Sequence, residues 1–458
     1  MRNFLLLLAI IAFGLSDPQK TLAHGIGQTY TLPLPLWLYL WASSAIVLLS
    51  FAVIAVLLSN HSPKYKEKNK VLLKVPSIFI NLAKFFSLFL FFITIIIGIF
   101  GNQDPVYNFA PNFFWSTFVI SFVVLSAFLG NWWQYVNPVR LIYSFFEKIS
   151  KDSRRPYFKY PRKLTYFPAV FFLFAFVWVE LVSQIADKPR AISLLIAIYA
   201  AFMLLGMSIF GPVFLQKADF LTVFSKLLLK ISFVSYKNSR VYLVNPIISI
   251  VKIERLNMLL VLFVILTLAG VAFDSFSESP SFWAIVSFFN LSEASYRFVR
   301  TIGLVAMIVP FATLYFTFLY LGNLIVSEKK KMSDLASYYV VSLLPISVAY
   351  FVAHYFPLFI VGIQNIAMIF GYSLGFFSEI NPGKINLALL NPTFVWYAQI
   401  VLIVLGHIAA VLCAHYISFK VYVSSKSALL SQYPVTLLMV VYTFFSLWLL
   451  SQPIVVSP

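Results

Sequence analysis

Long apolar runs separated by short basic connections make up most of this chain. Several runs reach or exceed the ~20 residues that a helix needs to cross ~30 Å of hydrocarbon. A β-barrel would instead show shorter segments in which apolar and polar residues alternate. The pattern therefore predicts an all-α, polytopic integral membrane protein with about ten transmembrane helices. We place these helices near residues 36–59, 80–100, 113–130, 167–185, 191–211, 257–273, 300–326, 336–361, 395–415 and 434–451.

The first residues show a pattern typical of a secretory signal peptide. Arg2 precedes an apolar run over residues 4–14, which is too short to cross a bilayer comfortably. Because Ala23 provides the small residue that cleavage requires, we expect residues 1–23 to be removed and residues 24–458 to form a single transmembrane domain. His24 would then be the mature N-terminus, where its amino and imidazole nitrogens could chelate a transition metal such as copper. An exposed histidine without a role is the alternative.

The positive charge of the chain is concentrated on one side of the predicted membrane. The formal net charge of +18 would suggest a nucleic-acid partner in a soluble protein. However, 26 of the 33 lysines and arginines fall in alternate connections, and only five fall in the connections between them. Positive residues favour the cytoplasmic side. We therefore expect a bacterial inner-membrane protein with both mature termini outside, the lipid bilayer as its partner and no nucleic acid.

Two of the basic connections, near residues 131–166 and 212–256, are longer than a turn requires. They mix large apolar residues with lysine and arginine, which predicts amphipathic helices at the membrane surface. On the opposite side, the apolar run over residues 366–377 is too short to span, so we expect it to be re-entrant or interfacial. The sequence contains no Walker loop, dinucleotide fingerprint or His-Glu-x-x-His zinc motif.

Ionisable side chains within the spans are the best candidates for function, because a charge inside the membrane is costly. The predicted orientation places several of them at one level, in the outer part of the bilayer. This predicts a polar pocket facing the periplasm. Its catalytic candidates are Glu180, Asp274 and Arg300, and its candidate ligands for a divalent transition metal are His24, His354 and His407.

The histidines and carboxylates also have structural interpretations. Glu180 and Arg300 could form an ion pair, and His354 could hydrogen-bond a helix backbone. His407 and His415 lie ~12 Å apart along one helix, so both cannot bind the same ion, and we favour His407.

Several short strings occur in an order that resembles a known family. They are His24-Gly25, Leu32-Pro33-Leu34-Pro35, Asn137-Pro138, Tyr160-Pro161-Arg162, Phe273-Asp274-Ser275-Phe276-Ser277, Ala353-His354-Tyr355-Phe356 and Gly406-His407. Together they resemble the polytopic membrane proteins called fenitrothion hydrolases, from the mature N-terminus to the ninth span. The resemblance implies hydrolysis of an aryl phosphorothioate triester, together with a second membrane subunit. It carries over no catalytic residue and leaves the native substrate open.

The predicted pocket and the resemblance are compatible with one reaction. A divalent metal held by His354, His407 or His24, with Glu180 or Asp274, could generate hydroxide for attack on phosphorus. A secondary transporter or metal-handling permease would use the same side chains to bind an ion or to relay protons. The third alternative is a non-catalytic subunit of a membrane complex.

Overall fold

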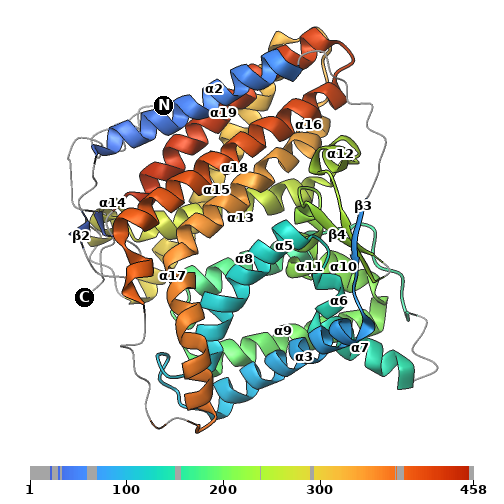
Figure 1. Ribbon diagram of the computed structural model, residues 1–458, viewed down its shortest axis with the longest axis vertical. Coiled ribbons are helices and arrows are strands. Elements are labelled where there is room, and N and C mark those ends of the chain that lie inside the picture. The colour runs from blue at the N-terminus through green and yellow to red at the C-terminus, as the bar shows by residue number, and fades with distance from the viewer. Residues whose placement is uncertain are drawn as a thin grey trace.

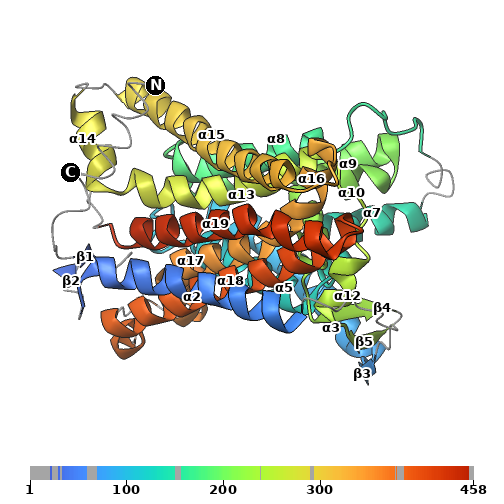
Figure 2. The ribbon, with the colours of Figure 1, turned by 90° about the horizontal axis from the view of Figure 1, so that it is seen from above.

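The computed structural model describes residues 21–22, 29–30, 34–58, 70–149, 156–237, 239–288, 293–376, 378 and 386–452. His24 and most of the predicted signal peptide lie outside these residues. Long helices dominate the described part, and most of them run side by side (Figures 1 and 2).

Within the described residues, nine helical segments are long and apolar enough to cross a membrane, which confirms the predicted all-α membrane fold. These segments are α2 (Leu36–Leu58), α3 (Ser77–Phe100), α4 with η1 and α5 (Phe109–Pro111, Asn112–Val119 and Ile120–Leu129), α9 (Pro189–Phe210), α13 (Met258–Ser277), α15 (Glu293–Ile325), α16 with η3 and α17 (Met332–Tyr339, Val340–Ser342 and Leu343–Ser373), α18 (Pro392–Val421) and α19 (Ser425–Leu450).

The span predicted at residues 167–185 is a shorter helix. Helix α8 (Phe167–Leu181) has 15 residues, which corresponds to ~22 Å at ~1.5 Å per residue. Gln184 has a φ of 60°, a left-handed conformation that an α-helix does not accommodate. The backbone N–H of Ile185 is bonded instead by the side chain of Ser183. The helix therefore ends soon after Glu180 and leaves that carboxyl near its terminus.

The run over residues 366–377, which we expected to be re-entrant or interfacial, is not a separate element. Helix α17 continues through it as far as Ser373, although Pro357 interrupts its hydrogen bonding. The re-entrant or interfacial placement of this run stays a prediction, although the run belongs to a longer helix that changes direction and is not an element of its own. The second half of α17 packs on α4 and η1, where Phe370 contacts Phe109 at a centroid distance of 5.0 Å. Figure 1 shows this change of direction.

The helices pack closely where small residues allow their backbones to approach, as is usual in membrane bundles. Helix α18 packs on α17, α19 and α2, and α13 packs on α8, α15 and α17. At Gly406 in α18, a Cβ atom would lie 2.3 Å from the Cβ of Ala349 in α17. Any larger residue at Gly406 would therefore push these two helices apart.

One end of the bundle, which we name the basic end, carries short helices and a small sheet. The helices are α6 (Trp133–Val136), α7 (Pro138–Ile149), α10 (Val213–Ala218), α11 (Phe220–Leu228) and α12 (Pro246–Val251). The antiparallel sheet has the order β3 (Lys70–Lys74), β5 (Arg240–Leu243), β4 (Val234–Lys237). This sheet was not predictable from the hydropathy pattern, because its strands are short and β3 joins the hairpin from a distant part of the chain.

Candidate functional site

The candidate site is centred on a contact between Asp274 and His354. Asp274 lies in the last turn of α13, and His354 lies near the middle of α17, which packs against α13. Nε2 of His354 is 2.8 Å from Oδ2 of Asp274. The histidine side chain is 1% exposed and the aspartate side chain is 14% exposed. The pair is therefore buried on its histidine side and more open on its carboxylate side.

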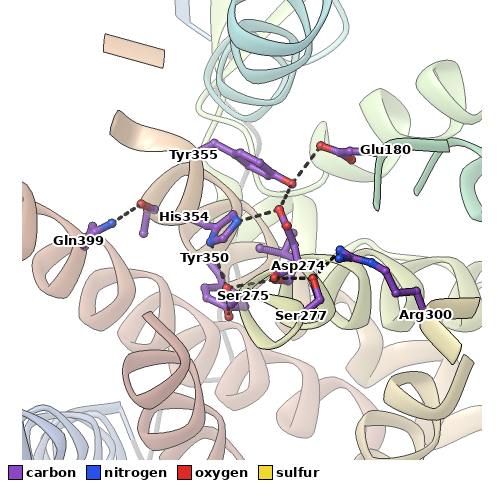
Figure 3. Close-up of polar contacts among 11 residues, drawn as sticks. Glu180, Asp274, Ser275, Ser277, Arg300, Tyr350, His354, Tyr355 and Gln399 are labelled. Atoms are coloured by element: carbon purple, nitrogen blue, oxygen red, sulfur yellow. Dashed lines mark hydrogen bonds and ion pairs between the residues drawn. The ribbon is translucent and has the colours of Figure 1, made fainter. Parts of the chain in front are cut away.

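Tyr355 connects this pair to Glu180 of α8. Its hydroxyl oxygen lies 2.6 Å from Oδ2 of Asp274 and 3.0 Å from Oε1 of Glu180 (Figure 3). Successive residues on a helix point ~100° apart, so His354 and Tyr355 reach the same aspartate from two directions. Two carboxyl groups from different helices thus share one phenol.

On the other side of His354, the contacts continue into the protein core. Nδ1 of His354 is 3.0 Å from Oγ of Ser275, which is 3.1 Å from the hydroxyl of Tyr350. Tyr350 and His354 lie one turn apart on the same face of α17. We name the resulting series the polar chain, and it consists of Glu180, Tyr355, Asp274, His354, Ser275 and Tyr350.

Counting protons shows what the polar chain requires. A phenol has one hydrogen, whereas an ionised carboxylate only accepts. Tyr355 therefore satisfies both carboxyl groups fully when it donates to one of them and accepts from the other, which must then carry a proton. A neutral imidazole has one donor and one acceptor nitrogen, so His354 can donate to Asp274 while it accepts from Ser275. The arrangement can hold an exchangeable proton at several positions.

Arg300 of α15 lies beside the polar chain, but it is not paired with Glu180 as one interpretation of the sequence proposed. Its guanidinium group donates to the hydroxyls of Ser277, at 2.8 Å, and of Tyr296, at 2.7 Å. It is also positioned over the rings of Phe282 and Tyr296. Since Ser277 is the last residue of α13, Arg300 holds the helix end that carries Asp274.

A further carboxyl group lies where α13 ends. Glu278 follows the last residue of the spanning helix. Burial, and secondarily the nearby carboxyl of Asp274, raise the pKa of Glu278, while Arg300 acts in the opposite direction. Glu278 is therefore a third acidic group, next to the two carboxyl groups of the polar chain.

Gln399 supports the backbone next to His354. Pro357 has no N–H, so the carbonyl of Ala353, four residues earlier, loses its helical donor. Nε2 of Gln399 in α18 donates to that carbonyl oxygen at 3.0 Å. The bend in α17 is thereby accommodated directly beside the polar chain, without leaving a buried acceptor unpaired.

His407 does not join this site through a contact in the described residues. Its Nδ1 donates to the carbonyl oxygen of Ile403 on its own helix, at 2.8 Å, and its ring is buried. His415 was the less favoured of the two candidate ligands. Its Nδ1 lies 2.9 Å from Oε1 of Gln432 in α19. Both positions fit a structural role within the helix packing.

The predicted ligands are thus only partly assembled. The described part of the chain holds no group of three or more His, Cys, Asp or Glu side chains arranged to bind a metal ion. His24 lies outside the described residues, and both ring nitrogens of His354 have partners in the polar chain. The metal site therefore remains a prediction.

The structure brings together Glu180, Asp274 and His354 and adds residues that the sequence analysis missed. These additions are Tyr355, Ser275 and Tyr350. Their signal in the sequence was the spacing of Tyr350 and His354 by four residues, with Tyr355 adjacent, on one predicted span. Tyrosine and serine are common in membrane helices, so this signal had little weight before the partners on α8 and α13 were known.

Comparison with family models, curated proteins and solved structures finds no match for this chain. Its class follows from the structure itself. The chain is an α-helical, multi-pass integral membrane protein with a series of ionisable and hydroxyl side chains among its spanning helices.

Proposed function

We propose that this protein moves protons along the polar chain as part of a proton-coupled secondary transporter. The observation that carries the proposal is the continuity of the chain, in which six side chains from α8, α13 and α17 lie within 2.6 to 3.1 Å of their neighbours. Series of Asp, Glu and His residues inside the membrane are typical of proton relays in transporters.

The surroundings of the polar chain also suit a transport cycle in which the helices alternate between two arrangements. One end, at Glu180 and Asp274, is partly exposed, whereas His354 and Ser275 are buried. The bend at Pro357 lies next to His354 and Tyr355, so a change in the angle of α17 would alter their distances to α8 and α13. A proton taken up at the carboxyl groups would thereby be coupled to the arrangement of the helices.

A second candidate is the hydrolysis of an apolar ester, the activity that the family resemblance implies. The observation that favours it is the order Ser275, His354, Asp274, in which a histidine lies between a hydroxyl and a carboxylate. This order is that of a nucleophile, a base and an orienting group. In the metal-assisted version, in which a divalent ion activates water, Glu180, Asp274 and His354 would have to rearrange to hold that ion, because the described residues do not present them as a metal-binding group. The resemblance implies a second membrane subunit for this hydrolase.

The experiment that separates these candidates needs no known substrate. Purified protein in vesicles is adsorbed on a solid-supported membrane, and the charge moved after a pH jump is recorded. We expect charge movement in the wild type and its loss in Asp274→Asn and Glu180→Gln, with Glu147→Gln in α7 as the control. Hydrolysis of an aryl phosphotriester in detergent, without proton-dependent charge movement, would instead support the hydrolase. Metal analysis of the same protein tests the metal-assisted version.

A further inference from the structure

A large apolar cavity lies apart from the polar chain, between α8 on one side and α3 and α9 on the other. Its volume is about 1020 Å³. This is at the upper end of the ~300–1,000 Å³ that is usual for small-molecule sites. It exists because α8 packs on α13, α10 and α11, whereas α9, the next long helix, packs on α3 and α10. The two sets of contacts hold the helices apart.

The walls of the cavity are apolar, and nearly half of the residues that line them are aromatic. Phe172 of α8 meets Tyr199 and Phe202 of α9 in edge contacts, at centroid distances of 5.1 and 5.2 Å. On η1, Trp115 meets Phe176 at 5.3 Å. The lining therefore presents ring faces and edges, which favour an occupant that itself contains a ring.

Apart from the ring N–H of Trp133, which has no hydrogen-bond partner, the few polar groups in the lining are engaged with the protein. Oδ1 of Asp219 accepts the hydroxyl of Tyr199 at 2.6 Å, and Oδ2 accepts the side chains of Asn137 and Thr222. The hydroxyl of Thr94 donates to the carbonyl oxygen of Leu90. Burial raises the pKa of Asp219, which lies outside the spanning segments, although these hydrogen bonds oppose the shift. The lining thus favours an uncharged ligand.

The mouth of the cavity opens at the level of the lipid. Among the lining residues, Phe171 of α8 is 54% exposed, and Ile198 and Phe202 of α9 are 63% and 47% exposed. Ile198 and Phe202 lie in the middle of the apolar helix α9, and Phe171 lies one turn into α8. A molecule dissolved in the bilayer can therefore enter sideways between α8 and α9 without passing through water.

We propose that this cavity is a binding site for an uncharged, ring-containing small molecule that enters from the bilayer. Recognition comes from shape and ring contacts, because the polar groups of the lining, apart from the ring N–H of Trp133, already have partners. The inference stands on the cavity alone and does not require proton movement through the polar chain.

The test uses an uncharged aromatic photolabel, phenyl(trifluoromethyl)diazirine, on the full chain in vesicles of phosphatidylethanolamine and phosphatidylglycerol. We expect saturable labelling near Phe172 and Phe202, which excess biphenyl suppresses. Filling the cavity with Ala175→Trp or Ala83→Trp should weaken saturable labelling about tenfold, or ~1.4 kcal/mol of binding free energy. Ala175 and Ala83 line opposite walls, so one variant serves if the other fails to fold. Ala45→Trp, on the exposed face of α2, should leave the labelling unchanged.

Two results would overturn the proposal. The first is labelling that is not saturable and is as strong on α2 as on α8 and α9, because the label would then report only contact with lipid. The second is a phospholipid that stays bound to the wild type in native mass spectrometry and is lost in Ala175→Trp. An acyl chain would then be the occupant of the cavity.

Discussion

The hydroxyl of Tyr355 lies 2.6 Å from the carboxyl of Asp274, on a neighbouring helix. The same oxygen lies 3.0 Å from Glu180, so this one phenol joins α8, α13 and α17. The proposed proton path passes through it.

Replacing Tyr355 with phenylalanine should therefore interrupt the path while the ring keeps its place in the core. We expect Tyr355→Phe to abolish the charge movement after a pH jump, at a stability cost of about 1 kcal/mol, the usual value for one lost hydrogen bond. Tyr372→Phe, which removes a hydroxyl from the same helix near Asn102, is the control. Unchanged charge movement in Tyr355→Phe would show that the phenol is not part of the path.

Proton counting predicts that one of the two carboxyl groups is protonated, and its reactivity can be measured. Dicyclohexylcarbodiimide modifies protonated carboxyl groups in apolar surroundings. We expect it to modify Glu180 or Asp274, detected by mass spectrometry of peptides, and to leave Glu147 near the basic end unmodified. Modification of Glu147 at an equal rate would mean that the reagent reports exposure rather than a retained proton.

The contact between Gln399 and the free carbonyl of Ala353 allows a double-mutant test. Gln399→Leu leaves that carbonyl without its donor and should cost about 1–2 kcal/mol, at the upper end of hydrogen bonds between membrane helices. Pro357→Ala restores the backbone N–H, so Gln399→Leu should cost less in that background. The measurement is thermal unfolding in detergent of the wild type, both single variants and the double variant. Equal costs in both backgrounds would refute the link between Gln399 and the bend.

Glu328 provides a test of pH dependence outside the spanning helices. Its carboxylate accepts the backbone N–H groups of Val423 and Ser424, at 3.0 and 2.7 Å, and these bonds lower the pKa of Glu328. A carboxyl whose pKa is lower in the folded state stabilises the protein above its unfolded-state pKa, and this stabilisation is lost as the pH falls through the folded-state value.

The stability advantage of the wild type over Glu328→Gln should accordingly be present at about pH 6 and shrink towards about pH 3.5. Thermal unfolding of both proteins over this range measures the difference, with Glu147→Gln in α7 as the control. A difference that grows on acidification would contradict the assigned direction.

The helical architecture was predictable because lipid imposes one simple requirement, a long apolar run for each crossing. The depth of Asp274, Glu180 and His354 followed from counting residues along those runs. The side chains that contact them could not be predicted from the sequence, since the depth of a residue does not determine which face of α17 meets α13. For this reason Tyr355 and Ser275 were missed, and His407 was grouped with residues that it does not contact in the described structure. The early end of α8 depended on the backbone conformation at Gln184, which hydropathy does not report.

The bend at Pro357 divides α17 into two arms with different neighbours. The first arm carries His354 and Tyr355. The second packs on η1, where Gly362 lies against Ser116, and other η1 residues, among them Trp115 and Phe118, line the apolar cavity. The bend thus places the polar chain on the first arm and links the second arm to the cavity wall. If a ligand in the cavity shifts the second arm of α17 and thereby changes the proton affinity of the polar chain, protonation of the polar chain must change the affinity for that ligand by the same factor. Photolabelling of the cavity at several pH values would measure that factor directly.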